Sequence, residues 1–330
     1  MVKEVKKSVY ILIGLAFALL LLAVSFQLTG NVISEIEQEN TLSDELNFFQ
    51  ILKKFFFGED TSISLAPGNV YYVDNSATST STCTNGATNY DVNSRSCGGG
   101  TGNVYLSPQA AADITVAGDS VEIRSGTYPP AGNVNDCIPV LDIKRGGSLG
   151  NPITFTAYKD SNGRYENVIL DAQMTTFFSV WISGVNDIVI DGLIATGGKR
   201  QGFQVGDHSG CGGSFYRGPA HDIIIRNSIA HDNGACNTWH GGFEVGGASY
   251  NVLFERDESY NNGQGFKVGD PHATSGTSIP YNIIIQYSLA RDNIIGGGNS
   301  NGFVFNAVRN SKMSHNVAYR NADTGAGSQG

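Results

Sequence analysis

The chain contains 330 residues, of which 42 are Gly, 9 are Pro, 15% are charged and 40% are hydrophobic. This much apolar surface excludes a disordered chain, and the low proline content excludes a collagen. The 21 Lys and Arg against 30 Asp and Glu give a net charge of -9, without the basic excess with which nucleic-acid binders neutralise phosphates. The composition therefore predicts a folded, acidic protein with no nucleic-acid partner.

Residues 1–30 are predicted to form a membrane anchor. An uncharged, proline-free apolar run extends from Val9 to Phe26 and follows a lysine-rich N-terminus. The run is close to the ~20 apolar residues of a spanning helix and exceeds the ~7–15 of a signal-peptide core. No small-x-small cleavage pattern follows Phe26, so an uncleaved anchor is favoured over a cleaved signal that would release a secreted protein. Under either interpretation the body of the chain lies outside the cytoplasm.

Residues 31–64 are predicted to be a stalk that carries a short amphipathic helix. Thr41 and Asp44 have the spacing of a helix start, and apolar residues recur at helical intervals from Leu42 to Leu52. Such a helix fits either the lipid surface or the open end of the domain that follows.

From residue 65 the chain changes to short β-rich runs. Alternating apolar residues predict strands within 69–73, 118–128 and 152–158, and a brief helix is expected at 108–113. The Ser-, Thr-, Asn- and Gly-rich range 76–102 is interpreted as a loop.

The five cysteines fit an oxidising exterior, where disulfides persist. The pairs nearest in sequence, Cys83 with Cys97 and Cys211 with Cys236, are the first candidates. This leaves Cys137 over, and connectivity cannot be deduced from spacing.

A motif of about 22–30 residues recurs in the second half of the chain. Each copy begins with an apolar, β-branched run, continues into an Asn or Asp turn, and is followed by a strand that opens with Gly-Phe. The first runs are 186–195, 221–230, 250–259, 281–290 and 310–318, and the Gly-Phe strands are 202–205, 242–245, 265–268 and 302–305. Helical repeats are excluded because the runs are too short and too β-branched. The fold class predicted for residues 65–330 is therefore all-β, a right-handed parallel β-helix with coils ~4.8 Å apart.

Alternation along the Gly-Phe strands predicts a row of side chains on the outer surface. If Phe243 and Phe266 point into the core, then Glu244 and Lys267 point outward as neighbours. The full row is Gln204, Glu244, Lys267 and Val304. Glu244 and Lys267 form either a structural cross-strand ion pair, worth ~0.2–1 kcal/mol, or part of a reactive site.

Two insertions, 207–219 and 270–280, are predicted to wall a cleft over this row. The candidate substrate-binding residues are Gln204, Asp207, His208, Trp239, Asp270 and His272. A sugar can stack on the indole of Trp239 beside His240, although a packed loop aromatic explains the indole equally well. For Asp207 and Asp270, turn formation is the competing explanation.

These motifs resemble secreted β-helix polysaccharide lyases, and the later ones resemble family 9 pectate lyases. The resemblance is carried by 69–73, 118–128, 150–158, 242–245, 262–269 and 301–306. It implies that Lys267, directly after the Phe of a Gly-Phe-Lys strand, is the base that removes the proton alpha to a uronate carboxylate. It also implies a calcium ion held by aspartates, but the matching positions hold Gln201, His240, Gly241 and Glu244, so Glu244 is the one carboxylate metal ligand among them.

The sequence and the resemblance together predict an extracytoplasmic protein that acts on acidic polysaccharide by β-elimination. Lys267, Glu244 and His240 are the candidate catalytic residues. The alternative is a non-catalytic surface protein for glycan binding or adhesion. A glycosidase is a further hypothesis, and it would need two carboxylic acids that face one cleft. The candidate pairs are Glu244 with Asp207 and Glu244 with Asp270. The edge of the last coil is expected to be covered by a partner or a further chain.

Overall fold

Strands dominate the part of the chain that the structure describes. The computed structural model describes residues 68–77, 83–132, 135–207, 211, 217–234, 240–269, 279–294 and 300–321. All of them belong to one compact unit, Leu65–Gly330. Their strands form three sheets, here named sheets A, B and C.

The bounds of the elements follow, sheet by sheet. Sheet A contains β1 (Val70–Val73), β2 (Ala87–Asp91), β3 (Ser96–Cys97), β4 (Gly102–Tyr105), β5 (Ser120–Ile123), β8 (Ile153–Ala157), β11 (Asn186–Asp191), β14 (His221–Arg226), β17 (Tyr250–Glu255), β20 (Tyr281–Gln286) and β23 (Lys312–Ser314). Sheet B contains β6 (Gly126–Tyr128), β9 (Val168–Asp171), β12 (Ile194–Thr196), β15 (Ile229–His231), β18 (Glu258–Tyr260), β21 (Leu289–Arg291) and β24 (Val317–Tyr319). Sheet C contains β7 (Leu141–Ile143), β10 (Phe178–Ile182), β13 (Gln201–Val205), β16 (Gly241–Val245), β19 (Gln264–Val268) and β22 (Phe303–Phe305), and the helix α4 spans Pro108–Ala112.

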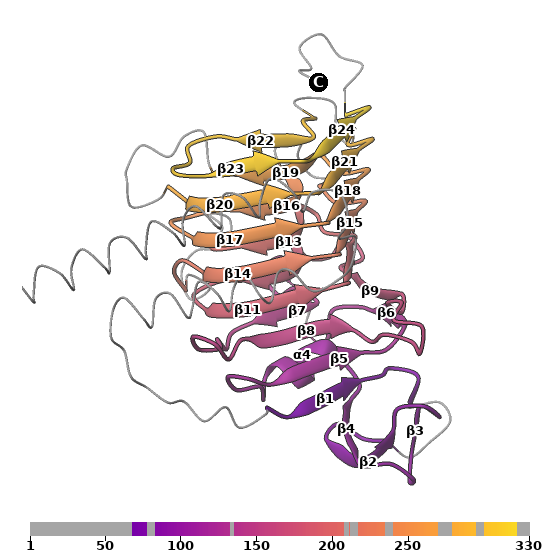
Figure 1. Cartoon of the computed structure of the whole chain (residues 1–330). Helices are drawn as coiled ribbons and strands as arrows, with labels where there is room; N and C mark the ends of the chain where they lie inside the picture. The colour runs from indigo at the N-terminus through magenta and orange to yellow at the C-terminus, as the bar shows by residue number, and fades with distance from the viewer. Residues whose placement is uncertain are drawn as a thin grey trace, which may run out of the picture. The chain divides into compact units, whose positions relative to one another are not determined.

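The chain visits the three sheets in turn, one coil after another. From β8 onward the strands follow the order A, B, C, and each strand pairs in parallel with its counterpart in the next coil. Figure 1 shows the coils stacked in chain order, with the colour changing steadily along the stack. The predicted parallel β-helix is confirmed. The two insertions fall between β13 and β14 and between β19 and β20, as predicted.

A column of phenylalanines fills the core behind sheet C. Phe203, Phe243 and Phe266 are fully buried, and the centroids of their rings lie 4.9 and 4.7 Å apart with nearly parallel planes. Phe303 continues the column at 4.9 Å. This spacing matches the ~4.7–4.9 Å between paired strands, so each Gly-Phe strand places one ring on the ring of the preceding coil.

A second column is polar and lies at the corner after sheet B. The buried side chains Asn233, Asn262, Asn293 and Asn321 stand one above another. The backbone N–H of Asn233 donates to Oδ1 of Asn262, that of Asn262 to Oδ1 of Asn293, and that of Asn293 to Oδ1 of Asn321. Each coil thus satisfies a corner N–H with an amide from the following coil.

Left-handed backbone angles occur at the same corner. Asp232, Asn261 and Asp292 have φ values of 56°, 51° and 51°. Asn and Asp tolerate this conformation better than other non-glycine residues. The expectation that these turn residues shape the coil corners is confirmed.

The range 76–102 is more ordered than the predicted loop. It contains β2 and β3, which pair antiparallel, and β2 also pairs antiparallel with β4. The predicted disulfide between Cys83 and Cys97 is present. The loop interpretation was wrong for residues 87–91 and 96–97, because Ala87–Asp91 mixes polar residues with a single buried ring, Tyr90, which gives no clear strand pattern.

A buried carboxylate ties this hairpin to the first coil. Asp74 is fully buried and accepts hydrogen bonds from Tyr90 Oη at 2.6 Å, Arg95 Nη2 at 2.7 Å and Ser76 Oγ at 2.7 Å. Burial raises the pKa of Asp74, but the hydrogen bonds from Arg95, Tyr90 and Ser76 lower it by more, so the pKa lies below its ordinary value.

Asp74 is therefore expected to make stability depend on acid pH. Since the folded state lowers the pKa, its contribution is present above the unfolded value of about 3.9 and is lost as pH falls through the folded value. Asp74→Asn should lower the urea concentration at the denaturation midpoint at pH 7. The difference in midpoint between wild type and variant should shrink progressively below about pH 4. Urea denaturation of both proteins between pH 7 and 2 measures this. The exposed Asp113→Asn serves as the control, and a deficit that stays constant with pH contradicts the assignment.

The N-terminal predictions lie outside the described residues. These are the membrane anchor within 1–30 and the amphipathic helix within 31–64. Among the residues that the structure does describe, no helix is long and apolar enough to cross a membrane. At the other end of the stack, Val317 and Tyr319 of β24 are 56% and 41% exposed. A partner or further chain over this last coil stays a prediction.

Candidate functional site

The outer face of sheet C carries the predicted row of side chains. Gln204 is in register with Glu244, Glu244 with Lys267, and Lys267 with Val304. The row also continues in the other direction, because Gln204 is paired with Trp181 of β10 and Trp181 with Asp142 of β7. We call this set, from Asp142 to Val304, the sheet C row.

Glu244 and Lys267 form an ion pair in this row. Lys267 Nζ donates to Glu244 Oε1 at 3.0 Å. Phe243 and Phe266 point into the core, as predicted. The pair itself is more enclosed than a simple surface ladder, since Glu244 is 6% exposed and Lys267 is 8% exposed. Two charges that leave water to this extent incur a desolvation cost that only good pairing offsets.

Gln201 and His240 complete a polar cluster around the pair. Gln201 Nε2 donates to Glu244 Oε2 at 2.7 Å and to His240 Nδ1 at 2.9 Å. His240 Nδ1 lies 3.7 Å from Glu244 Oε2. An amide nitrogen donates and cannot accept, so Nδ1 of His240 is the acceptor in this contact. We call Gln201, His240, Glu244 and Lys267 the sheet C cluster.

Among the amide oxygens of sheet C that accept no hydrogen bond from the part of the chain that is described are two on fully buried side chains. These are Oε1 of Gln201 and Oε1 of Gln204, both on side chains with no exposure. The amide nitrogen of Gln204 is engaged, since it donates to Val205 O at 3.1 Å. A buried acceptor without a donor costs about 1–3 kcal/mol. Sites that bind or react with a ligand are one place where folded proteins tolerate such atoms.

A calcium site of the implied kind does not fit the described residues. Calcium takes ~6–8 oxygen ligands, several of them carboxylate. Glu244 engages Lys267 through one oxygen and Gln201 through the other. Across the described ranges no three His, Cys, Asp or Glu side chains come together as a metal group.

Asp207 organises the base of the first insertion. Its Oδ1 accepts from Ser183 Oγ at 2.5 Å and from the backbone N–H of Arg217 at 3.1 Å, and its Oδ2 accepts from the N–H of Gly218 at 2.7 Å. These contacts favour the turn-forming explanation of Asp207. The other predicted substrate-binding residues, His208, Trp239, Asp270 and His272, lie outside the described residues.

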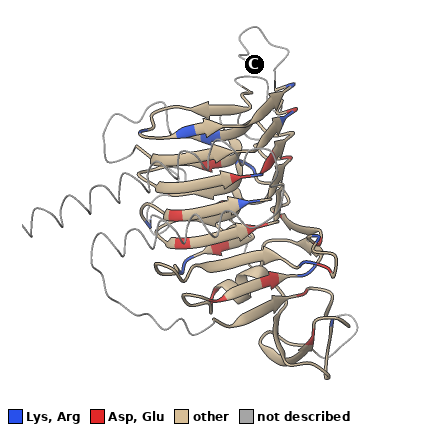
Figure 2. Cartoon of the chain, in the orientation of Figure 1, with Lys and Arg blue, Asp and Glu red and all other residues tan. Residues whose placement is uncertain are grey.

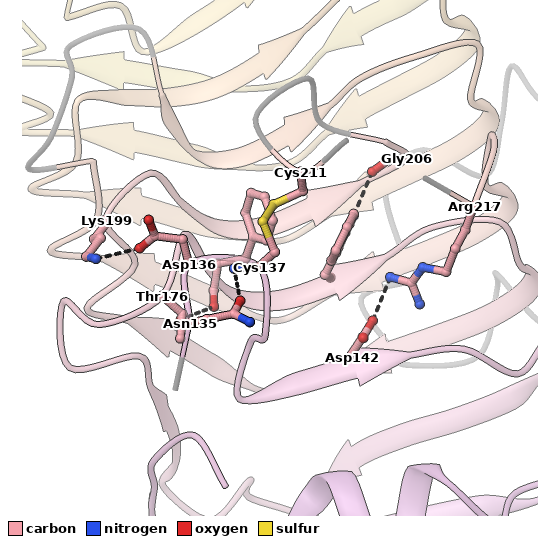
Figure 3. The surroundings of a disulfide bond; sticks show 11 residues. Asn135, Asp136, Cys137, Asp142, Thr176, Lys199, Gly206, Cys211 and Arg217 are labelled. Atoms are coloured by element: carbon pink, nitrogen blue, oxygen red, sulfur yellow. Dashed lines mark hydrogen bonds and ion pairs between the residues drawn. A yellow bond between two sulfur atoms is a disulfide. The ribbon is translucent and has the colours of Figure 1, made fainter. Parts of the chain in front are cut away.

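The second disulfide joins Cys137 to Cys211, so the predicted pairing of Cys211 with Cys236 is wrong. Cys236 lies outside the described residues. The two bonded cysteines are 74 residues apart in sequence, but the stacking of coils brings them together. The bond packs with Phe178 and Trp181 of β10 over the outer face of sheet C. Figure 3 shows it beside the contact between Arg217 and Asp142. Spacing along the chain cannot show proximity that arises between coils.

Sequence reasoning also missed the N-terminal end of the sheet C row. Trp181 is fully buried, and its indole N–H donates to Gly206 O at 2.9 Å. The Arg217 guanidinium lies 4.5 Å from the centroid of the Trp181 ring and donates to Asp142 Oδ1 at 2.6 Å. The signal available was the run Phe178–Ile182, whose buried tryptophan precedes the repeats.

Comparison with known proteins finds similarity of fold. No protein-family model matches the sequence, and no curated protein matches it. Solved structures that are similar include an alginate lyase from Paenibacillus sp. str. FPU-7, with 16% identity and a TM-score of 0.42 over 65% of this chain and 74% of that one. A rhamnogalacturonan lyase shares 14% identity with a TM-score of 0.41, over 77% of this chain and 69% of that one. Pectate lyase Pel9A shares 15% identity with a TM-score of 0.42, over 76% of this chain and 64% of that one. The chain is structurally similar to β-helix polysaccharide lyases.

Proposed function

We propose that this protein acts outside the cytoplasm on uronate-containing polysaccharide, and that the sheet C cluster is the reaction centre of a β-elimination. The observation that carries the proposal is the direct hydrogen bond between Lys267 Nζ and Glu244 Oε1 on the outer face of a parallel β-helix. Two disulfides support the compartment, because such bonds persist in oxidising surroundings.

The pair can supply both the base and the acid of the reaction. Moving the shared proton from Lys267 to Glu244 gives an amine beside a carboxylic acid. A glycan that covers the cluster excludes water, which makes the ion pair more costly and favours this neutral pair.

The elimination then returns the pair to its starting state. The Lys267 amine takes the proton alpha to the uronate carboxylate, the electron pair of that C–H bond forms the C=C bond, and the bond to the glycosidic oxygen breaks. Glu244 gives its proton to the departing oxygen. After one turnover Lys267 is again an ammonium and Glu244 a carboxylate, so no co-reactant is consumed.

Gln201 and His240 act as positioning residues in this scheme. Gln201 holds Glu244 Oε2 at 2.7 Å, and His240 accepts the second hydrogen of the same amide. Together they fix the rotamer of the carboxylate toward Lys267, which is the arrangement that proton exchange requires.

The test measures the ultraviolet absorbance of unsaturated uronate products from polygalacturonate, alginate and rhamnogalacturonan. Lys267→Arg is the sharpest variant, since arginine keeps a cation beside Glu244 but cannot become a base. Its rate should fall at least a hundredfold, in the range that general base catalysis contributes. Lys312→Arg, at an exposed position of β23, is the matched control and should leave the rate unchanged. A wild-type protein that forms no product from any substrate, or Lys267→Arg with the wild-type rate, refutes the proposed reaction.

A second candidate function is glycan binding without turnover. The observation that favours it is that Glu244 and Lys267 satisfy each other inside the cluster, as a purely structural pair does. Binding of uronate oligomers by a wild-type protein that forms no product would assign this function.

A further inference from the structure

A pocket of about 290 Å³ opens at the N-terminal end of the sheet C row. Its wall includes Asp142 and Lys144 from the β7 region, Arg217 from the end of the first insertion, and the apolar residues Ile138 and Pro139. The volume is at the lower end of small-molecule pockets. It therefore suits a single sugar unit.

The pocket is positively charged although the whole chain carries a net charge of -9. Arg217 Nη2 lies 2.6 Å from Asp142 Oδ1, and Lys144 Nζ lies 3.3 Å from Asp142 Oδ2. One carboxylate thus stands between two cations, which leaves one positive charge in excess. Figure 2 shows the Lys and Arg positions scattered among the Asp and Glu positions along the ribbon.

Both cations keep donors for a ligand. Arg217 has five N–H donors, and its side chain uses two of them on Asp142 and on Ile143 O at 3.4 Å. Lys144 has three donors, one contact with Asp142, and a side chain that is 57% exposed. A carboxylate that bridges the two cations would make charge-assisted hydrogen bonds to both.

The scaffold of the pocket is rigid. The Arg217 guanidinium is held over the Trp181 ring, and the Cys137–Cys211 disulfide packs against the same indole. Gln109 of α4 fixes Asp142 by accepting from its backbone N–H at 2.7 Å and donating to its carbonyl at 3.1 Å. Arg217 and Asp142 are therefore already in place before a ligand arrives, which reduces the ordering cost of binding.

The pocket also lies in line with the sheet C cluster. Asp142 and Lys267 are four strands apart in the same register, along β7, β10, β13, β16 and β19. At ~4.8 Å per strand the separation is about 19 Å. One extended oligosaccharide can reach both places, whereas a single sugar cannot.

From these observations we infer that the pocket formed by Lys144, Arg217 and Asp142 is a second binding site for a uronate unit, which anchors the glycan about four strands away from the reacting bond. The apolar residues Ile138 and Pro139 pack against the sugar ring, and the two cations take its carboxylate. This inference rests on the proposed function, since it adds a remote contact for the same polysaccharide.

The test measures binding of oligogalacturonate by calorimetry in a Lys267→Arg background, in which turnover should be slowed at least a hundredfold. Lys144→Gln should weaken binding about tenfold, the effect expected on losing one charge-assisted hydrogen bond. The carboxyl-reduced, neutral oligomer should bind equally to both proteins. Lys312→Gln removes the same charge from an exposed position of β23 and controls for general electrostatic attraction. It should leave binding within twofold of its parent.

Three outcomes overturn the inference. The first is equal weakening by Lys144→Gln and Lys312→Gln, and the second is no difference between charged and neutral oligomers. The third is stronger displacement by a sulfated oligosaccharide, which would assign the pocket to sulfate esters rather than to uronate.

The proposed reaction is tested separately. If no substrate is cleaved while Lys144→Gln still weakens binding of the charged oligomer selectively, the proposed reaction is refuted and the assignment of the pocket as a uronate site is supported. If cleavage occurs and Lys144→Gln leaves both binding and the KM for long oligomers unchanged, the reaction stands and the pocket is refuted.

Discussion

Replacing Phe243 with alanine is expected to lower the free energy of unfolding by about 3–5 kcal/mol. The ring is fully buried and stacks between Phe203 and Phe266, with centroids 4.9 and 4.7 Å away. Phe254 also meets it edge to face at 5.6 Å. The cavity cannot close easily, because strands on both sides fix the positions of the neighbouring rings.

Phe303→Ala is the matched control for this change. Phe303 stacks on Phe266 at 4.9 Å but is only half-buried at the end of the column. Phe303→Ala should lower the free energy of unfolding by about half as much as Phe243→Ala, because an accessible site can refill with water or relax. Urea denaturation followed by fluorescence compares the two variants. Equal decreases in the free energy of unfolding would contradict this prediction, because they would mean that burial between two other rings adds nothing to the contribution of a phenylalanine.

Breaking the ion pair of the sheet C cluster from one side is expected to cost about 3–5 kcal/mol of stability. Glu244→Leu leaves the Lys267 ammonium enclosed without its carboxylate partner. Lys267→Met leaves the Glu244 carboxylate enclosed without its ammonium partner. The double variant removes both charges and should recover at least half of either loss, because no uncompensated charge remains.

An exposed pair provides the comparison for this double-mutant cycle. Arg291 and Glu258 lie 2.7 Å apart, against 3.0 Å for Lys267 and Glu244, but their side chains are 28% and 29% exposed. Glu258→Leu should cost less than about 1 kcal/mol, as is usual for surface pairs. Equal costs for Glu244→Leu and Glu258→Leu would show that the cluster is effectively solvated. The cycle also separates stability from reaction, since the double variant should be stable and inactive.

The repeats made the fold predictable from sequence. Each Gly-Phe strand places a buried ring and an outward side chain at fixed positions, so aligning the repeats predicted the register of Glu244 with Lys267, and alternation predicted that both point outward. The predicted Asn and Asp turns likewise coincide with left-handed corners, as at Asp232 and Asp292.

The missed features depend on contacts between coils that no repeat encodes. Asp142 and Trp181 precede the repeated motif, and Arg217 ends an insertion, so nothing local indicates that the three meet. The Cys137–Cys211 bond has the same origin. The low exposure of Glu244 and Lys267 was also unpredicted, because alternation indicates which way a side chain points but not what lies over it.

The asparagine column has a consequence for how such a protein can grow. Successive partners in it are separated by 29, 31 and 28 residues, and every link has the same donor and acceptor. Duplicating one such segment would insert a new layer whose backbone N–H and side-chain amide both find ready counterparts above and below. Lengthening the body by gene duplication, or by design, therefore leaves the remaining layers undisturbed and extends the outer surface of all three sheets.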